Sequence, residues 1–92
     1  LLAEADGELV GTLIAAWDGW RGNMYRLAVR ADWRRHGVGT ALVRAGEERL
    51  RACGAKRITA LVVTDDEVAG GLWASVGFAF DEAVGRYVRN LA

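Results

Sequence analysis

A short stretch at residues 34–42, "RRHGVGTAL", combines positive charge with glycine directly before an apolar helical pattern. Gly37 and Gly39 permit backbone conformations that other residues resist, and they let a ligand approach the main chain closely. The first turn of a helix offers unpaired N–H groups and a partial positive charge, and the two arginines and the histidine before the glycines add direct charge. The stretch therefore predicts a binding site for phosphate or pyrophosphate.

Two common phosphate-binding motifs do not fit this stretch. The dinucleotide fingerprint G-x-G-x-x-G needs a third glycine where Leu42 stands, and the P-loop needs a lysine that is absent here. The pattern present is R-x-x-G-x-G, which begins at Arg34 after an apolar strand pattern and ends at Gly39 where a helix starts. A glycine-rich loop whose arginines are only solvated is the alternative interpretation.

The elements that must position this loop follow from changes of hydrophobic period along the chain. Apolar segments at residues 1–5, 9–17 and 24–29 are typical of strands, and the turn sequences "DGE" and "DGWRGN" join them. Residues 38–53 have helical periodicity, and residues 58–63 are typical of a buried strand. A strand–helix–strand crossover of this kind predicts parallel pairing with a right-handed connection.

The rest of the chain predicts a second helix and a closing hairpin. Residues 65–76 carry an apolar stripe, and Asp65 or Asp66 can cap this helix at its amino end. The segments "GFAF" and "GRYVRNL" are typical of the two strands of a hairpin. The predicted order is β-β-β-α-β-α-β-β, an α/β fold with a mixed antiparallel and parallel sheet, in a single domain over residues 1–92.

One apolar stripe runs along the first predicted helix through Leu42, Gly46 and Leu50. Cys53 continues this stripe, so we expect it to be a small, buried apolar residue. Gly54 follows directly and is typical of the residue that ends a helix in a left-handed conformation.

Composition and charge exclude several classes of protein. Hydrophobic residues make up 52% of the 92 residues, so we expect a folded chain and not a disordered tail. Twelve basic residues balance twelve acidic ones, which argues against a nucleic-acid or membrane-surface protein. The single cysteine excludes an internal disulfide and a cysteine-based metal cluster. Because no apolar run has membrane length and the chain lacks a basic signal-peptide start, we expect a cytoplasmic protein. We expect no metal site.

Two segments resemble the GNAT superfamily of N-acetyltransferases. Residues 25–43, "YRLAVRADWRRHGVGTALV", closely resemble its signature of a strand ending in apolar-x-Val, then R/Q-x-x-G-x-G/A and a long helix. Residues 69–78, "AGGLWASVGF", resemble its motif A-x-x-L-Y-x-x-x-G-F on the penultimate helix and the strand after it. The two motifs occur in the family's order with a buried strand between them, and the resemblance covers essentially the whole chain.

The resemblance implies that acetyl-CoA is the cofactor. Its pyrophosphate would lie on the backbone N–H groups of residues 35–40, near the guanidinium of Arg34. Its pantetheine arm would pair with the strand at residues 27–29, where such folds splay this strand from the parallel one at residues 58–63. The coenzyme-binding residues implied in this way are Leu27, Ala28, Val29, Arg34, Arg35, His36, Gly37, Val38, Gly39 and Thr40.

The sequence departs from the family pattern in three respects. Trp73 stands where the family often has the tyrosine that protonates the departing thiolate, and an indole cannot donate that proton. Asp66 stands where an asparagine is common. The family's first strand and first two helices have no counterpart in the chain. Tyr25, on the strand beside the cofactor, is a candidate substitute acid, and a sheet-face aromatic is its alternative interpretation.

The resemblance therefore implies an N-acetyltransferase in which an acceptor amine, on a small molecule or a peptide, attacks the thioester directly. A non-catalytic acyl-CoA-binding or interaction domain is the alternative, supported by the departures from the pattern. A nucleotide-binding fragment of another lineage is a third interpretation. The candidate acceptor-site residues, each with a structural or solvated alternative, are Trp17, Trp20, Trp33, Glu4, Asp18 and Asp32.

The opening meander raises a question of assembly. Without the family's amino-terminal elements, we expect it to expose apolar surface and a free strand edge, and such edges invite pairing. A homodimer, or an amino-terminal extension that covers this surface, is therefore expected.

Overall fold

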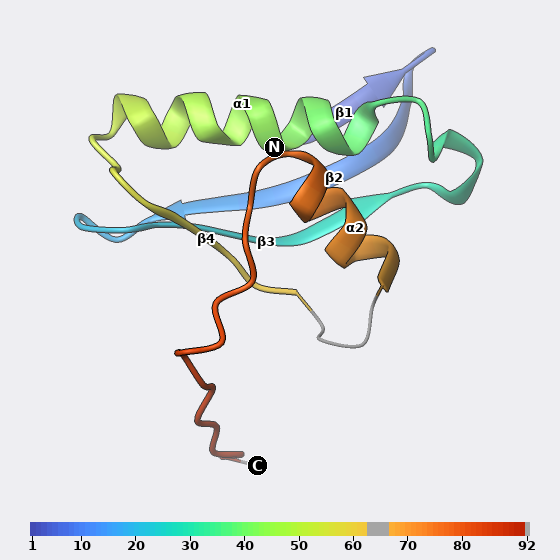
Figure 1. Ribbon diagram of the computed structural model, residues 1–92. Helices are drawn as coiled ribbons and strands as arrows, with labels where there is room; N and C mark the ends of the chain where they lie inside the picture. Colours follow the sequence, from blue (N-terminus) through green and yellow to red (C-terminus); the bar gives the residue numbers. More distant parts are fainter. Residues whose placement is uncertain (63–66, 92) are drawn as a thin grey trace.

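The computed structural model describes residues 1–62 and 67–91, which form one sheet and two α-helices (Figure 1). The elements are β1 (Leu2–Ala5), β2 (Glu8–Trp17), β3 (Gly22–Val29), the 3-10 helix η1 (Ala31–Trp33), α1 (Val38–Ala52), β4 (Ile58–Ala60) and α2 (Glu67–Ser75). The sheet has the order β1-β2-β3-β4; its first two pairings are antiparallel and the third is parallel. The predicted mixed sheet is confirmed, and the predicted order of strands and α-helices is confirmed as far as α2.

Two tight turns fold the first three strands into a meander. Asp6 and Gly7 have φ angles of +52° and +77°, so both residues are left-handed in the β1–β2 turn. At the β2–β3 turn, Asp18 Oδ1 accepts the N–H groups of Arg21 and Trp20 at 2.6 and 2.8 Å. These two hydrogen bonds hold the pKa of Asp18 below its usual value, and the bond from Arg21 has the larger effect. Asp18 therefore has a structural role as a turn cap.

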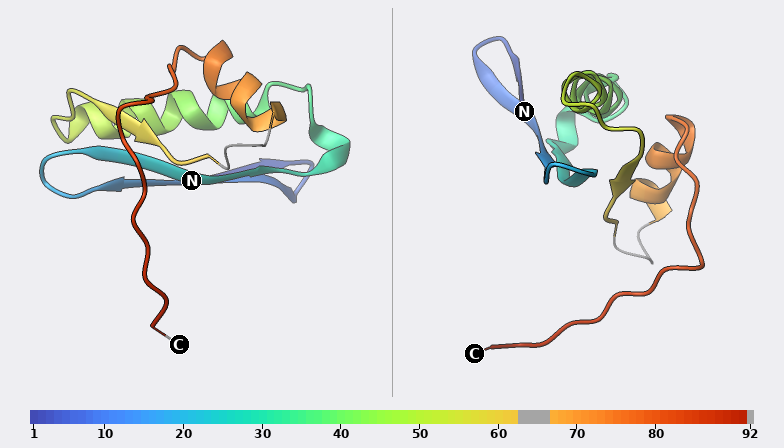
Figure 2. Two further views of the ribbon diagram at one scale, coloured as in Figure 1. Left: turned by 60° about the horizontal axis from the view of Figure 1, so that its bottom comes forward. Right: turned by 90° about the vertical axis from the view of Figure 1, so that its left-hand side faces the viewer.

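Helix α1 covers one face of the sheet (Figures 1 and 2). It ends at Ala52, and Gly54 follows the cap residue with a φ of +99°. The Gly54 N–H donates to the Arg51 carbonyl, and the Ala55 N–H donates to the Leu50 carbonyl. This is the helix-terminating arrangement expected for glycine after the last turn. The buried core between helices and sheet consists of Leu13, Met24, Leu42, Val43, Leu50 and Trp73.

Gly46 lets α1 approach the sheet closely. A Cβ atom at this position would lie 2.8 Å from Met24 Cε and 3.3 Å from Leu13 Cδ2, and both side chains are fully buried. We therefore predict that Gly46→Ala lowers the free energy of unfolding by about 1–3 kcal/mol through overpacking. Urea unfolding measures the loss.

The matched control for this substitution is Gly70→Ala in α2. A Cβ atom there meets no described atom within 4 Å, so we expect Gly70→Ala to stabilise the chain by about 0.5–1 kcal/mol. Equal effects of the two substitutions would contradict the close approach of α1 to the sheet.

An extra residue interrupts β3. Thr12 pairs with Ala28, but Ile14 pairs with Tyr25, so three steps along β3 match two steps along β2. Arg26 lies inside this bulge with a φ of +56°. A bulge shifts the alternation of side chains between the two faces of a strand. As a result, both Met24 before the bulge and Val29 after it face α1.

The closing hairpin predicted from "GFAF" and "GRYVRNL" is wrong. No strand forms in described residues 76–91, and the chain runs outward after α2 (Figure 2). The edge strand β4, to which the hairpin would add, is three residues long, and an isolated two-stranded hairpin is marginally stable in water. The exposed fractions of the large apolar side chains in this segment lie between 72% and 101% for Phe80, Val84, Tyr87, Val88 and Leu91.

Two smaller expectations also need correction or limits. Cys53 is exposed, because α1 ends at Ala52 and Cys53 is the cap residue beyond the buried stripe. Strand β4 stops at Ala60, so the predicted strand at residues 58–63 is too long where the structure describes it. The proposed cap residues Asp65 and Asp66 lie outside the described residues, as does residue 63.

Candidate functional site

Strands β3 and β4 pair over three residues and then separate. The paired positions are Gly22 with Ile58, Asn23 with Thr59 and Met24 with Ala60. The last bond joins the Leu61 N–H to the Met24 carbonyl at 3.0 Å. Beyond Met24, β3 continues to Val29 without a β4 partner among the described residues. The edge of β3 that includes residues 27–29 is therefore open to an additional extended segment.

The end of β3 and the start of α1 lie at the same end of the molecule, joined by the loop at residues 30–37 (Figure 1). Gly37 is the residue before α1 and has a φ of +79°, and its carbonyl accepts the Ala41 N–H at 3.0 Å. No described side chain caps α1 at this end, and its first turn holds no acidic residue. The first N–H groups of α1, at Val38, Gly39 and Thr40, are therefore available to an anion. The helix dipole contributes about 0.3–1 kcal/mol to such binding, and up to about 2 in a partly buried site.

Gly39 has a packing role in addition to its place in the loop motif. It is buried, and a Cβ atom on it would lie 3.1 Å from Leu72 Cδ2 and 3.7 Å from Val29 Cγ2. The absence of a side chain at Gly39 thus lets α2 and the end of β3 pack against the start of α1. Gly37 differs, because a Cβ atom there would meet no described atom within 4 Å.

The basic residues near this loop have different partners. Arg34 and Arg35 are exposed, and no carboxylate pairs with either among the described residues. His36 is exposed too, and its ring packs against the Trp33 ring at 5.2 Å between centroids. Arg30, in contrast, forms ion pairs with two carboxylates. The positive charge available to a ligand therefore comes from Arg34 and Arg35, and the exposed His36 ring lies in the same loop.

Tyr25 lies where β3 and β4 begin to separate. It is the first β3 residue beyond the last paired position, and it is half-buried opposite Ile14 of β2. Because Met24 faces α1 and side chains alternate along a strand, Tyr25 points to the other face of the sheet. The strand rise places it about 13 Å from Val29, so Tyr25 and the loop lie at two ends of the open β3 edge.

Trp73 is a core residue of α2. It is 5% exposed and packs edge-on against Phe78, with the ring centroids 5.0 Å apart. We predict that Trp73→Phe lowers the free energy of unfolding by about 1–3 kcal/mol, because a cavity replaces part of the indole. Thermal unfolding of the variant beside the unmodified chain measures this loss. An unchanged thermal midpoint would contradict the core role of Trp73.

The other aromatic residues do not converge on one pocket. Trp17 is half-buried and packs against the core. Trp20 is 74% exposed at the β2–β3 turn, where the Arg21 guanidinium lies 4.4 Å from its ring centroid. Trp33 lies in η1, beyond the opposite end of β3. The carboxylates considered with them are also dispersed, with Asp18 in a turn and Asp32 paired to Arg30.

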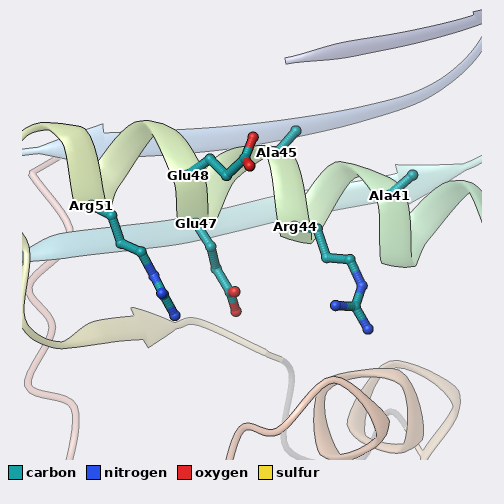
Figure 3. Close-up of a pocket in the computed structure, with 6 residues that line it drawn as sticks. All are labelled: Ala41, Arg44, Ala45, Glu47, Glu48 and Arg51. Carbon is teal, nitrogen blue, oxygen red and sulfur yellow. The ribbon is translucent and has the colours of Figure 1, made fainter.

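An open hollow of about 520 Å³ lies on the outer face of α1 (Figure 3). Its lining residues are Ala41, Arg44, Ala45, Glu47, Glu48 and Arg51. Figure 3 shows Arg44, Glu47 and Arg51 directed to the same side of the helix. Because basic and acidic side chains alternate there, the hollow has no concentrated charge for a ligand. Among residues 1–62 and 67–91, no cluster of His, Cys, Asp and Glu is arranged to hold a metal, and no helix is long and apolar enough to cross a membrane.

Solved structures share this fold. An aminoglycoside 6'-N-acetyltransferase from Acinetobacter haemolyticus superposes with a TM-score of 0.80 at 22% identity, over 99% of this chain and 69% of that one. The aminoglycoside N-acetyltransferase AAC(6')-Iy, crystallised in complex with CoA, gives 0.83 at 19% identity, over 97% and 73%. An aminoglycoside acetyltransferase from an uncultured soil metagenomic sample gives 0.78 at 29% identity, over 99% and 64%. The chain therefore shares its fold with these acetyltransferases.

The sequence comparison defines the family. A profile described as the acetyltransferase (GNAT) family matches residues 1–78. The chain belongs to this family. It spans between 64% and 73% of the length of the three solved structures named above. The match ends at residue 78, near the start of the segment at residues 76–91 that lacks the predicted hairpin.

Proposed function

We propose that residues 1–92 act as one partial GNAT domain, an acetyl-CoA-dependent N-acetyltransferase whose acceptor amine attacks the thioester directly. The observation that carries this proposal is the uncapped amino end of α1, with Gly37 left-handed before it, beside the open edge of β3. Family membership supports it. The complex of a neighbour with CoA supports the choice of coenzyme.

The residues of the proposed site divide into two groups. The N–H groups of residues 35–40 bind the pyrophosphate, the guanidinium of Arg34 adds charge beside it, and His36 lies in the same loop. The main chain of residues 27–29 pairs with the pantetheine arm as an extra strand, and its N–H groups polarise the thioester carbonyl. When bound, acetyl-CoA supplies the activated acetyl group.

Positioning of the amine is the largest expected contribution to rate. Holding two reactants in a reactive geometry contributes about 7–11 kcal/mol, whereas a placed general acid contributes about 10²–10⁴-fold. A thiolate is also a tolerable leaving group, because an ordinary thiol has a pKa near 8.5. Loss of the family's tyrosine at Trp73 is therefore compatible with catalysis.

A non-catalytic acyl-CoA-binding or interaction domain is the second candidate. Trp73 favours it, because this side chain packs in the core at the position where the resemblance expects a proton donor. The second candidate keeps the proposed coenzyme loop and predicts binding of CoA without turnover.

Thiol release from acetyl-CoA across a panel of amines separates these functions. Because the structural neighbours include aminoglycoside acetyltransferases, the panel contains aminoglycosides, polyamines and peptides with free amino termini. Amine-dependent thiol release supports the transferase, and calorimetric CoA binding without release supports the second candidate. No CoA binding would overturn both. Thermal protection by ATP or NAD in place of CoA would favour a nucleotide-binding fragment.

We also propose that the chain forms a homodimer. Strand β1 is an edge of the sheet, and Leu2 and Leu9 near it are exposed. Pairing of two such edges satisfies their backbone groups and covers apolar surface. Sedimentation at micromolar concentration is expected to give a dimer, and a monomer there would contradict this proposal.

A further inference from the structure

Arg30 joins the end of β3 to both β2 and the start of the loop. Its N–H donates to the Val10 carbonyl of β2 at 2.8 Å, and its own carbonyl accepts the Trp33 N–H at 2.9 Å. The main chain at Arg30 is thus fixed on the β2 side and on the η1 side.

The Arg30 side chain makes the same two connections. Its Nη1 donates to Glu8 Oε2 at 2.8 Å, and its Nε donates to Asp32 Oδ1 at 3.0 Å, with a second bond from Nη2 to the other Asp32 oxygen. The pKa of Asp32 is held below its usual value, chiefly by these hydrogen bonds from Arg30. Single exposed ion pairs contribute little to stability, but a planar guanidinium held by two carboxylates fixes a direction as well as a charge. The geometry therefore serves orientation more than stability.

We propose that Arg30 is a positioning residue for the coenzyme loop: by tying Glu8 of β2 to Asp32 of η1, it fixes the path of residues 31–37 and hence the N–H groups at the start of α1. The proposal rests on the proposed function. Two carboxylates already neutralise the Arg30 charge, so Arg30 itself does not bind phosphate. Arg34, which has no described carboxylate partner, supplies charge to the ligand instead.

The test compares Arg30→Met with Arg34→Met and with the control Arg89→Met, whose side chain lies in the exposed segment after α2. Amide hydrogen exchange in residues 31–37 is expected to become at least about fivefold faster in Arg30→Met only, because local opening controls exchange. In Arg30→Met, the Kd for CoA is expected to rise about five- to tenfold. The kcat of this variant at saturating coenzyme is expected to stay within twofold of that of the unmodified chain. Arg34→Met weakens binding mainly at low salt, because exposed charges are screened at high salt.

Arg30→Lys separates geometry from charge. A lysine keeps the charge but cannot hold two carboxylates in a planar fork, so exchange and Kd are expected to stay close to those of Arg30→Met. Restoration of both by lysine would overturn the inference.

Three other results would also overturn it. Unchanged loop exchange in Arg30→Met would show that Arg30 does not hold the loop, and faster exchange with unchanged Kd would show that the hold is irrelevant to the coenzyme. In both cases the proposed function stands. Failure of the unmodified chain to bind CoA would overturn the proposed function and this inference together.

Discussion

Gly37→Val is expected to lower the affinity for CoA at least about 100-fold, equivalent to about 2.8 kcal/mol, in a chain that still folds. Gly37 has a φ of +79°, and a side chain in this conformation costs about 1–2 kcal/mol, more when it is β-branched. The added side chain also occupies the space beside the first N–H groups of α1, where the proposed pyrophosphate lies. Calorimetric titration with CoA measures the loss.

Gly7→Val is the matched control. Gly7 has a nearly equal φ of +77° and equally open surroundings, but it lies in the β1–β2 turn. Both variants are expected to lose similar stability, and only Gly37→Val is expected to lose CoA affinity. Gly39 is less suitable for this test, because a side chain there contacts Leu72 and disturbs the packing of α2 on α1. Unchanged affinity in folded Gly37→Val protein would remove the anion site from the proposal.

The parts of the fold that depend on local pattern were predictable from the sequence. The period of apolar residues located the carboxyl end of α1 to within one residue. Gly54 indicated the same end, because glycine adopts the left-handed conformation after a helix without the steric cost of a Cβ atom. The crossover rule predicted the parallel pairing of β3 with β4. The loop before α1 was predictable because the backbone freedom of glycine and the positive charge of arginine do not depend on neighbouring residues.

Features that depend on distant contacts were not predictable. The bulge in β3 places Arg26 at a positive φ, which arginine does not prefer, so no residue type marked it in advance. The bond from Arg30 to Glu8 spans 22 positions in the chain, and no residue near either position in the sequence indicates the pair. The predicted hairpin failed for a related reason. Its strands had a suitable pattern, but a strand forms only where an edge is long enough to receive it.

The family resemblance located positions, but it could not describe their surroundings. Alignment with the family placed Trp73 where a proton donor is common, while the structure places this side chain in the core beside Phe78. Tyr25 was a candidate from the sequence only because it lies on the strand beside the expected cofactor. The structure shows that Tyr25 occupies the point where β3 and β4 separate. A substitute acid is therefore better sought on β3 than on α2.

If Tyr25 donates the proton to the departing thiolate, Tyr25→Phe is expected to lower kcat by about 10²–10⁴-fold. The KM for acetyl-CoA is expected to change little, because the phenol acts on the leaving group in the transition state and not on the bound coenzyme. Steady-state kinetics with the best amine of the panel measure both constants. The half-buried phenol ring is retained in the variant, so its thermal midpoint is expected to stay close to that of the unmodified chain.

Tyr87→Phe provides the control, since Tyr87 is fully exposed in the segment after α2 and undergoes the same chemical change. Its kcat is expected to equal that of the unmodified chain. A kcat for Tyr25→Phe within twofold of this control would make Tyr25 a sheet-face aromatic only. Catalysis would then depend on placement of the amine and on the N–H groups of β3, without a side-chain acid. A fall in kcat confined to Tyr25→Phe would instead place the proton donor at the opening between β3 and β4, on the sheet face opposite α1.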